Sequence, residues 1–360
     1  MSAESVRKWE VFAEAMKAAP EAPEWPAIEC TEDLVLAGRA VREAFCRSVQ
    51  LLTTADGAGI NAFDQRKYAQ FVWFRGESHS NPEEPLCPQV FRDDFQLSRV
   101  DGWRSAEKWM ITEFWRKAVL RSAHCPDPQR LLAWLALAQH HGLPTRLLDW
   151  SESINTAAWF ATHDDPLARA RSDLAGILDE AERVGSGLRD RLVASVEGGE
   201  RGRIKRFLKP GPTVIWALSP ALLNWHFSAP NNNGAFVFVN NDDPLLKYAY
   251  TGDISATPDV RAIWVQDVHP RMMSQNAYFT VHSTGKSLVN LNRQTPQSER
   301  FLIRLTVEPE ASSGILKDLA TAGVTLSTVY PDLSNLASDI SARWKDIVSS
   351  IRSDLAGAPV

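Results

Sequence analysis

The segment Phe71-Val72-Trp73-Phe74-Arg75-Gly76-Glu77 sets the fold of this chain, because it is its most strand-like stretch and is followed at once by charged residues. Its first four residues combine aromatic and β-branched side chains, which is typical of a buried strand. Arg75 follows directly, so the sequence predicts an arginine at the end of this strand. Polar side chains at the end of a strand are often placed to bind a ligand.

Two helices are predicted before this strand. Residues 2–19 carry apolar side chains at helical spacing, and a proline-rich connector ends the pattern. Thr31 is a plausible N-cap for a second helix, whose apolar stripe continues until Asp56-Gly57. Residues 1–60 are therefore predicted to form a helical N-terminal extension.

More helices are predicted between the first strand and residue 165. Residues 85–91 favour a short strand, and 103–121 favour a helix. Asp127-Pro128 predicts the start of an apolar helix that ends at Gly142. Ser151 is predicted to cap the following helix.

The second half of the chain is richer in strands. Strands are expected at 213–218, 235–239, 260–265, 278–281 and 301–307, followed by a helix near 309–322, a strand-like stretch at 324–329 and a C-terminal helix. Helices first and strands later favour an α+β fold with a mixed, mostly antiparallel central sheet and flanking helices. The expected domains are the extension, a main domain at 61–336 with a charged helical insertion at about 167–209, and a C-terminal helix at 337–360 packing on it.

Composition limits the classes of function. The chain has 39 basic and 44 acidic residues and a formal charge of −5, so it has no global attraction to nucleic acid or to an anionic membrane. A local basic cluster at 201–209 could still contact phosphates. No apolar run is long enough to span a bilayer and no signal peptide is recognisable, so we expect a cytoplasmic protein without a membrane partner. The four cysteines are widely spaced, and neither a disulfide framework nor a metal site is expected.

Polar chemistry is densest in Gln139-His140-His141-Gly142-Leu143-Pro144-Thr145-Arg146-Leu147-Leu148-Asp149-Trp150. The two histidines fall in the last turn of the predicted helix. This run and the Trp73-to-Glu77 strand together resemble the signature of the FRG domain family, named for Phe-Arg-Gly. Trp159-Phe160-Ala161, the stretch from Arg271 to Thr280 and Val329-Tyr330-Pro331-Asp332-Leu333 are similar to its later blocks.

The FRG resemblance covers roughly residues 71–336 with the insertion looped out. Ala277 departs from it, because the family usually has glycine there, and this is expected to perturb one backbone turn. The resemblance implies a bacterial protein with a role in anti-phage defence or in a toxin system.

A weaker resemblance to ADP-ribosyltransferases implies NAD as substrate. Those enzymes hold NAD with an Arg-Gly or His-Gly on an early strand, place aromatic residues against nicotinamide and use a late Glu on the ribose. Phe74-Arg75-Gly76 looks like the first element, and Gln275 falls where the late Glu would be sought. The expected catalytic residues are His141, Asp149 and Gln275. The expected ligand-binding residues are Arg75, Gly76, Glu77, Thr145, Arg146, Trp150 and Arg271.

Gln275 leaves catalysis open, because an amide has no titratable carboxylate and cannot act as a general base. Asp149, Glu77 or His141 would then have to activate a protein or nucleic-acid acceptor. The alternative is a non-catalytic module that senses a nucleotide or nucleic acid. A nuclease or phosphoesterase would need metal ligands, for which the sequence offers no convincing acidic cluster.

Structural interpretations stand beside each of these roles. Arg146 and Asp149 could belong to a buried ion-paired network. His140 could simply interact with the helix dipole. Trp150, Trp159 and Phe160 are better explained as core residues than as a stacking platform.

Overall fold

A computed structural model describes residues 2–18, 24–55, 71–78, 86–92, 103–122, 125–128, 130–163, 212–227, 260–265 and 270–356, with short pieces at 177, 183–188 and 190–191. Their centre is one six-stranded antiparallel sheet in the order β4-β5-β2-β1-β3-β6. Its strands are β1 (Trp73–Glu77), β2 (Leu147–Ser151), β3 (Val214–Leu218), β4 (Val260–Ile263), β5 (Ala277–His282) and β6 (Leu302–Thr306). The predicted α+β class is confirmed.

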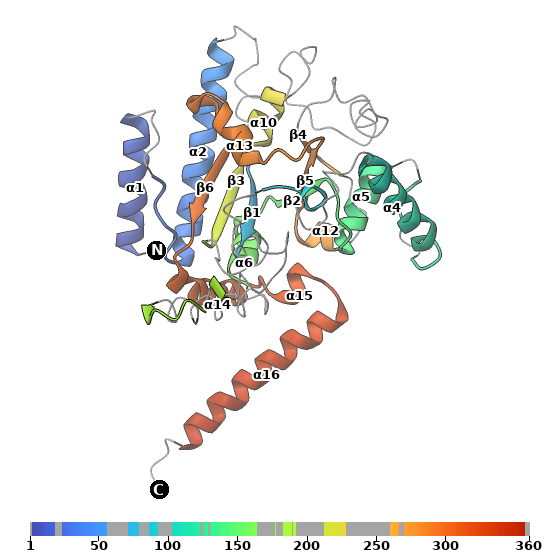
Figure 1. Cartoon of the computed structure of the whole chain (residues 1–360). Coiled ribbons are helices and arrows are strands. Elements are labelled where there is room, and N and C mark those ends of the chain that lie inside the picture. The colour runs from blue at the N-terminus through green and yellow to red at the C-terminus, as the bar shows by residue number, and fades with distance from the viewer. Residues whose placement is uncertain are drawn as a thin grey trace.

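Helices flank this sheet on both sides. They are α1 (Ala3–Ala18), α2 (Thr31–Ala55), α4 (Trp103–Ala118), α5 (Leu131–His140), α6 (Ile154–Thr162), α10 (Pro220–Phe227), α12 (Pro270–Ser274), α13 (Leu288–Gln294), α14 (Ser312–Thr321), α15 (Leu326–Val329) and α16 (Leu333–Ala356). Figure 1 shows α1 and α2 beside β6, with α4 and α5 at the opposite end of the molecule. None of the described helices is long and apolar enough to cross a membrane.

Strand β1 lies later in the chain than the sequence pattern suggested, because Phe71 and Val72 precede it and Arg75, Gly76 and Glu77 lie within it. All five of its residues pair with β3, and Arg75 lies opposite Trp216. On its other side the ladder with β2 is recorded at the single pair Phe74–Ser151. The charged residues were predicted to follow the strand, but the β3 ladder continues past the apolar stretch and includes them.

Gly76 is required by the packing of α6 on β1. A Cβ at this position would lie 1.8 Å from the carbonyl oxygen of Ala157 and 2.6 Å from the amide nitrogen of Ala161. Both atoms belong to the α6 backbone, which cannot move aside as a flexible side chain would. Gly76 therefore lets a helix lie directly against the strand that carries Arg75.

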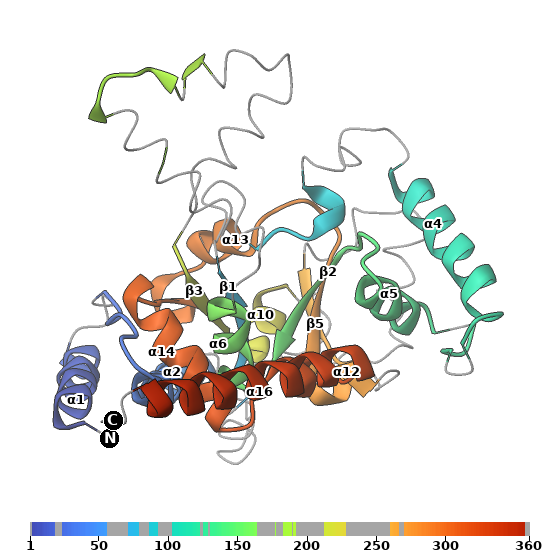
Figure 2. The ribbon, with the colours of Figure 1, turned by 90° about the horizontal axis from the view of Figure 1, so that it is seen from below.

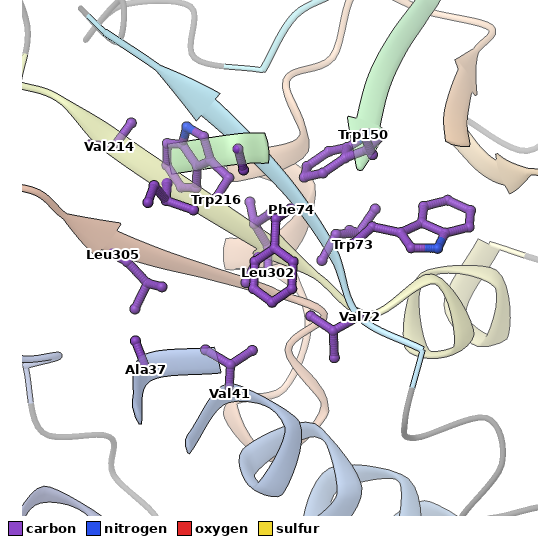
Figure 3. Close-up of a cluster of buried hydrophobic side chains, with 14 of the residues drawn as sticks. Ala37, Val41, Val72, Trp73, Phe74, Trp150, Val214, Trp216, Leu302 and Leu305 are labelled. Atoms are coloured by element: carbon purple, nitrogen blue, oxygen red, sulfur yellow. The ribbon is translucent and has the colours of Figure 1, made fainter. Parts of the chain in front are cut away.

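The apolar residues form two large clusters. The first joins α1, α2 and α6 to β1, β3 and β6, and Figure 3 shows Phe74, Leu305 and Val41 among its side chains. The second joins α5 to β2, β4 and β5 through residues such as Leu135, Leu147 and Phe279. The short strand β2 contributes to both, because alternate side chains point to opposite faces of a sheet.

The predicted N-terminal helices are confirmed as α1 and α2, and they are joined by buried polar contacts. Asp33 of α2 accepts hydrogen bonds from Trp9 Nε1 at 2.9 Å and from Lys8 Nζ at 2.7 Å. The connector between the helices joins the sheet through a parallel bridge between Ile28 and Val307. The extension is thus continuous with the main hydrophobic core.

Several local predictions are corrected. Residues 85–91 hold no strand in their described part, since Gln89–Phe91 form a 3-10 helix. The strand-like stretch at 324–329 holds the helix α15, which begins with a capping box at Thr325. Helix α6 is capped by Ser153, whose side chain accepts from Thr156 N at 3.2 Å, and Ser151 instead ends β2. Over such short lengths an apolar composition is compatible with either a strand or a helix. The capping contacts of α6 and α15 favour the helix.

The other strands agree with the sequence, and 213–218, 260–265, 278–281 and 301–307 correspond to β3 to β6. The strand expected at 235–239 and the basic cluster at 201–209 lie outside the described residues. Helix α16 runs beneath the rest of the molecule, and its far end extends well away from the sheet (Figures 1 and 2).

Candidate functional site

Arg75 occupies the gap between β1 and β2. Its Nη1 donates to the main-chain oxygen of Asp149 at 2.9 Å and lies 2.9 Å from Asp149 Oδ2. Its Nε lies 3.4 Å from Glu77 Oε1, on the same strand. The Arg75 side chain thus joins β1 to β2 next to their single backbone pair, Phe74–Ser151. It places a positive charge between the carboxylates of Glu77 and Asp149.

Asp149 is the accessible member of this group. About half of its side chain, 52%, is exposed, whereas only 17% of the Arg75 side chain is. Desolvation works against ionisation of Asp149, but the positive charge of Arg75 and the hydrogen bonds to the carboxylate outweigh it and lower its pKa. Asp149 therefore presents a stable negative charge at the surface.

A chain of side-chain hydrogen bonds orients Asp149. Gln139, in the last turn of α5, donates from Nε2 to Asp149 Oδ1 at 2.8 Å. The buried hydroxyl of Thr145 donates to Gln139 Oε1. Thr145 was a predicted site residue, but Gln139 was not. Gln139 lies in the same polar run, ten residues before Asp149, and this position could have indicated its role.

Glu77 and Arg92 extend the group. Trp216 of β3 donates from Nε1 to Glu77 Oε2 at 3.1 Å, which fixes the carboxylate beside Arg75. Arg92 donates from Nε to Cys87 O at 2.8 Å, and burial together with the nearby charge of Arg75 lowers its pKa. Neither Trp216 nor Arg92 was predicted, because strand register and loop placement bring them here.

These residues form what we call the Arg75 cluster: Arg75, Glu77, Arg92, Gln139, Asp149 and Trp216. Two guanidinium groups balance two carboxylates, so the cluster is formally neutral. Preorganised charges of both signs suit a ligand that carries both an anionic group and a centre that becomes positive. Among the described residues, no group of three or more histidine, cysteine or acidic side chains could hold a metal ion.

The region that holds most of these residues resembles a known family. Residues 70–169 match the family model of the FRG domain. This chain contains an FRG domain. The match includes Arg75, Glu77, Arg92, Gln139 and Asp149, so it covers all of the Arg75 cluster except Trp216. No curated protein and no solved structure gave a significant match.

Arg146 of the FRG domain pairs with an acid from helix α4. It forms a buried ion pair with Glu107 of α4, with Nε 2.9 Å and 3.1 Å from the two carboxylate oxygens and a further bond from Nη2. The Arg146 side chain is 1% exposed and that of Glu107 is 0%. A buried ion pair of Arg146 therefore exists, but its acid is Glu107 of α4 and not Asp149.

The two histidines lie at the end of α5, as predicted. His141 is the exposed C-cap residue, and Gly142 follows with a φ of +83°. The His141 ring contacts Phe114 of α4 and the His140 ring, with centroids 5.9 Å and 4.9 Å apart. The His141 ring thus packs against α4 and the end of α5.

The aromatic residues of the FRG signature lie in the core. Trp150 is 3% exposed and donates from Nε1 to Thr280 at 3.1 Å, and it alternates with Asp149 along β2. Trp159 is 2% exposed and stacks on His163 with centroids 4.1 Å apart. These contacts agree with the interpretation of both tryptophans as packing residues.

Gln275 lies near the end of β2 that follows Asp149. Its main-chain oxygen accepts from Ser151 Oγ at 2.6 Å, and its side-chain Nε2 donates to Val329 O at 3.0 Å. The amide therefore links this turn to α15. The turn's left-handed residue is Asn276, with a φ of +45°, and Ala277 begins β5. The side chain of Arg271 lies outside the described part of the structure.

Proposed function

We propose that this FRG domain binds an NAD-like dinucleotide at the Arg75 cluster and cleaves the bond between nicotinamide and ribose, as an ADP-ribosyltransferase or NAD glycohydrolase. The observation that carries the proposal is the half-exposed Asp149 carboxylate, which Arg75 and Gln139 hold in an ionised and oriented state. The sequence resemblance to ADP-ribosyltransferases at Phe74-Arg75-Gly76 supports it.

The chemistry requires a negative charge at the reacting ribose. When the N-glycosidic bond breaks, nicotinamide leaves as a neutral molecule with the bonding electron pair, and positive charge develops on the ribose. A fixed carboxylate stabilises that charge without having to reorganise. A carboxylate with a lowered pKa is a weak base, so Asp149 would act through its charge. Water or an acceptor hydroxyl then forms the new bond and releases its proton to solvent.

The arginines would serve the anionic part of the ligand. Arg75 is already balanced by Glu77 and Asp149, so its role is to position Asp149. Arg92 brings the second positive charge, and a planar guanidinium suits the oxygens of a diphosphate. Arg92 would therefore hold the diphosphate, although sequence analysis named only Arg75, Arg146 and Arg271 as ligand-binding arginines.

Incubation with NAD labelled in the nicotinamide or the adenine moiety tests the proposal. The wild-type chain should release nicotinamide or label a protein, DNA or RNA acceptor, and Asp149→Asn should reduce the rate by about 10²-fold or more. Glu310→Gln, which changes an exposed acid in another part of the fold, is the matched control. Equal rates in wild type, Asp149→Asn and a no-protein blank rule out the enzymatic function.

A second candidate is a nucleotide-sensing module without turnover. It is favoured by Gln275, whose amide donates to Val329 O and cannot replace the late carboxylate of a transferase. This candidate predicts NAD or another nucleotide binding that weakens with salt and with Arg92→Gln, but yields no product. Calorimetric titration at two ionic strengths, with product analysis of the same samples, separates it from the enzyme. A defence or toxin role, as the FRG resemblance implies, is compatible with either candidate.

A further inference from the structure

Helix α16 carries an apolar stripe that the other described elements leave exposed. Leu333, Leu336, Ile340, Trp344 and Ile347 are 83%, 45%, 58%, 64% and 50% exposed. The first part of the helix contacts α15. Its 24 residues, Leu333 to Ala356, span about 36 Å at 1.5 Å per residue, and its far end extends away from the body (Figure 1). A stripe of this size on one face is typical of an interaction surface.

The spacing of the stripe is that of a coiled-coil seam. Alternating steps of four and three residues connect Leu333, Ala337, Ile340, Trp344, Ile347 and Ile351. Such spacing keeps one seam facing a partner helix and assigns these residues to the a and d positions of a heptad. Asp339 and Lys345 fall outside the seam, and only Arg343 flanks it.

We propose that α16 pairs with α16 of a second copy of this chain as an antiparallel two-stranded coiled coil. The steps 4-3-4-3-4 read the same in both directions, so a reversed copy presents an identical seam centred on position 342. Ala337 then faces Ile347 of the second copy, and Ile340 faces its Trp344. The largest and the smallest seam residues, Trp344 and Ala337, then each meet an isoleucine, which packs better than the Trp–Trp and Ala–Ala layers of a parallel pair.

The charges permit this pairing. Asp339 accepts from Ser327 N at 2.8 Å, and the nearby Arg343 contributes to lowering the pKa of its carboxyl. Arg343 is thus partly compensated within its own helix, one turn after Asp339. The seam itself is uncharged, so two copies meet without placing a buried charge between them.

The area predicts the strength of the pair. Six apolar side chains from each copy would bury on the order of 1,000 Å² in total, just below the ~1,200–2,000 Å² of stable complexes. We therefore expect a monomer–dimer equilibrium with a Kd in the micromolar range. Closed two-fold symmetry limits the assembly to a dimer.

Sedimentation velocity over about 1–200 µM tests the association, since this range surrounds a micromolar Kd. The wild-type chain should shift from monomer to dimer, and Ile340→Glu should remain monomeric at every concentration. The matched control is Ser338→Glu, which places the same charge on the opposite side of α16 and should still dimerise. A wild-type chain that stays monomeric, or a control that dissociates equally, overturns the proposal.

Disulfide trapping tests the antiparallel arrangement. A mixture of Ile340→Cys and Trp344→Cys chains should form mixed cross-linked dimers, because these positions face one another across an antiparallel pair. Either variant alone should cross-link no more than wild type, whose four native cysteines give the background. Efficient cross-linking of Trp344→Cys alone indicates a parallel pair and overturns the antiparallel register.

Discussion

Arg75 Nη1 lies 2.9 Å from Asp149 Oδ2 and donates to the main-chain oxygen of Asp149 at the same distance, so one guanidinium group joins strand β1 to strand β2. The contact fixes both the Asp149 backbone and its carboxylate. Asp149 contributes in return, because its negative charge and that of Glu77 outweigh desolvation and raise the pKa of Arg75. Position and ionisation of the candidate site are thus set by the same pair.

Removing this arginine should raise the pKa of Asp149. In the wild-type chain the depressed pKa keeps Asp149 ionised to lower pH than an ordinary aspartate, and its charge is lost only as the pH falls through that value. In Arg75→Gln the loss should begin at higher pH. Carboxyl NMR titration of wild type and variant measures the shift, with Arg304→Gln on the exposed face of β6 as control. An unchanged Asp149 titration contradicts the assignment.

Gly76→Ala should prevent stable folding of the FRG domain. The new Cβ would meet two backbone atoms of α6 at 1.8 Å and 2.6 Å, so the helix must leave the strand. We expect a loss of at least about 3 kcal/mol, at the upper end of the usual overpacking effects. Gly314→Ala in α14 is the matched control, because its Cβ meets nothing within 4 Å and should stabilise the helix by about 0.5–1 kcal/mol. Urea unfolding of both variants decides.

Sequence patterns predicted strands β3 to β6 and part of β1, but they did not predict β2, which carries Asp149, or the neighbours that complete the site. Strands β3 to β6 follow from dense apolar runs, since a buried strand has little freedom of composition. Trp216 reaches Glu77 because β3 pairs with β1 in a particular register, and register between distant strands is not encoded locally. Gln139 was within the predicted polar run, yet only the turn at Gly142 brings it back to Asp149.

The Arg146–Glu107 pair illustrates the same limit. Local spacing suggested Arg146 with Asp149, three residues away, but Arg146 lies just before β2 and its side chain pairs with α4, whereas Asp149 lies within the strand. Glu107 is 39 residues distant and is brought close by the packing of α4. Short-range chemistry is therefore visible in this sequence, whereas partners that depend on tertiary packing are not.

Breaking that buried pair should be more harmful than deleting it. Glu107→Leu leaves the Arg146 guanidinium buried without its carboxylate, which costs about 3–5 kcal/mol of unfolding free energy. The double variant Glu107→Leu with Arg146→Met removes both charges and should recover most of that loss. Chemical denaturation of the single and double variants gives the comparison. If the double variant is less stable than Glu107→Leu, the pair stabilises the fold through more than mutual neutralisation.

His282 should make the free energy of unfolding depend on pH. Burial outweighs the backbone contact from Lys286 and lowers the pKa of His282 from 6.5 to about 3, so the folded chain keeps this ring neutral while the unfolded chain protonates it. The unfolded state then binds more protons between pH 3 and 6.5. Stability is full above this window and falls as the pH drops, by up to about 1.4 kcal/mol per pH unit.

His282→Gln tests this contribution, since an amide can keep a hydrogen bond to Thr280, which lies 3.1 Å from His282 Nε2. The variant cannot titrate, so its unfolding free energy should decline less steeply than that of wild type between pH 6.5 and 4. Carboxylates elsewhere contribute equally to both chains and cancel in the difference. If the unfolding free energies of both chains decline equally with pH across this range, the prediction is wrong, because His282 then binds its proton as readily in the folded chain as in the unfolded one.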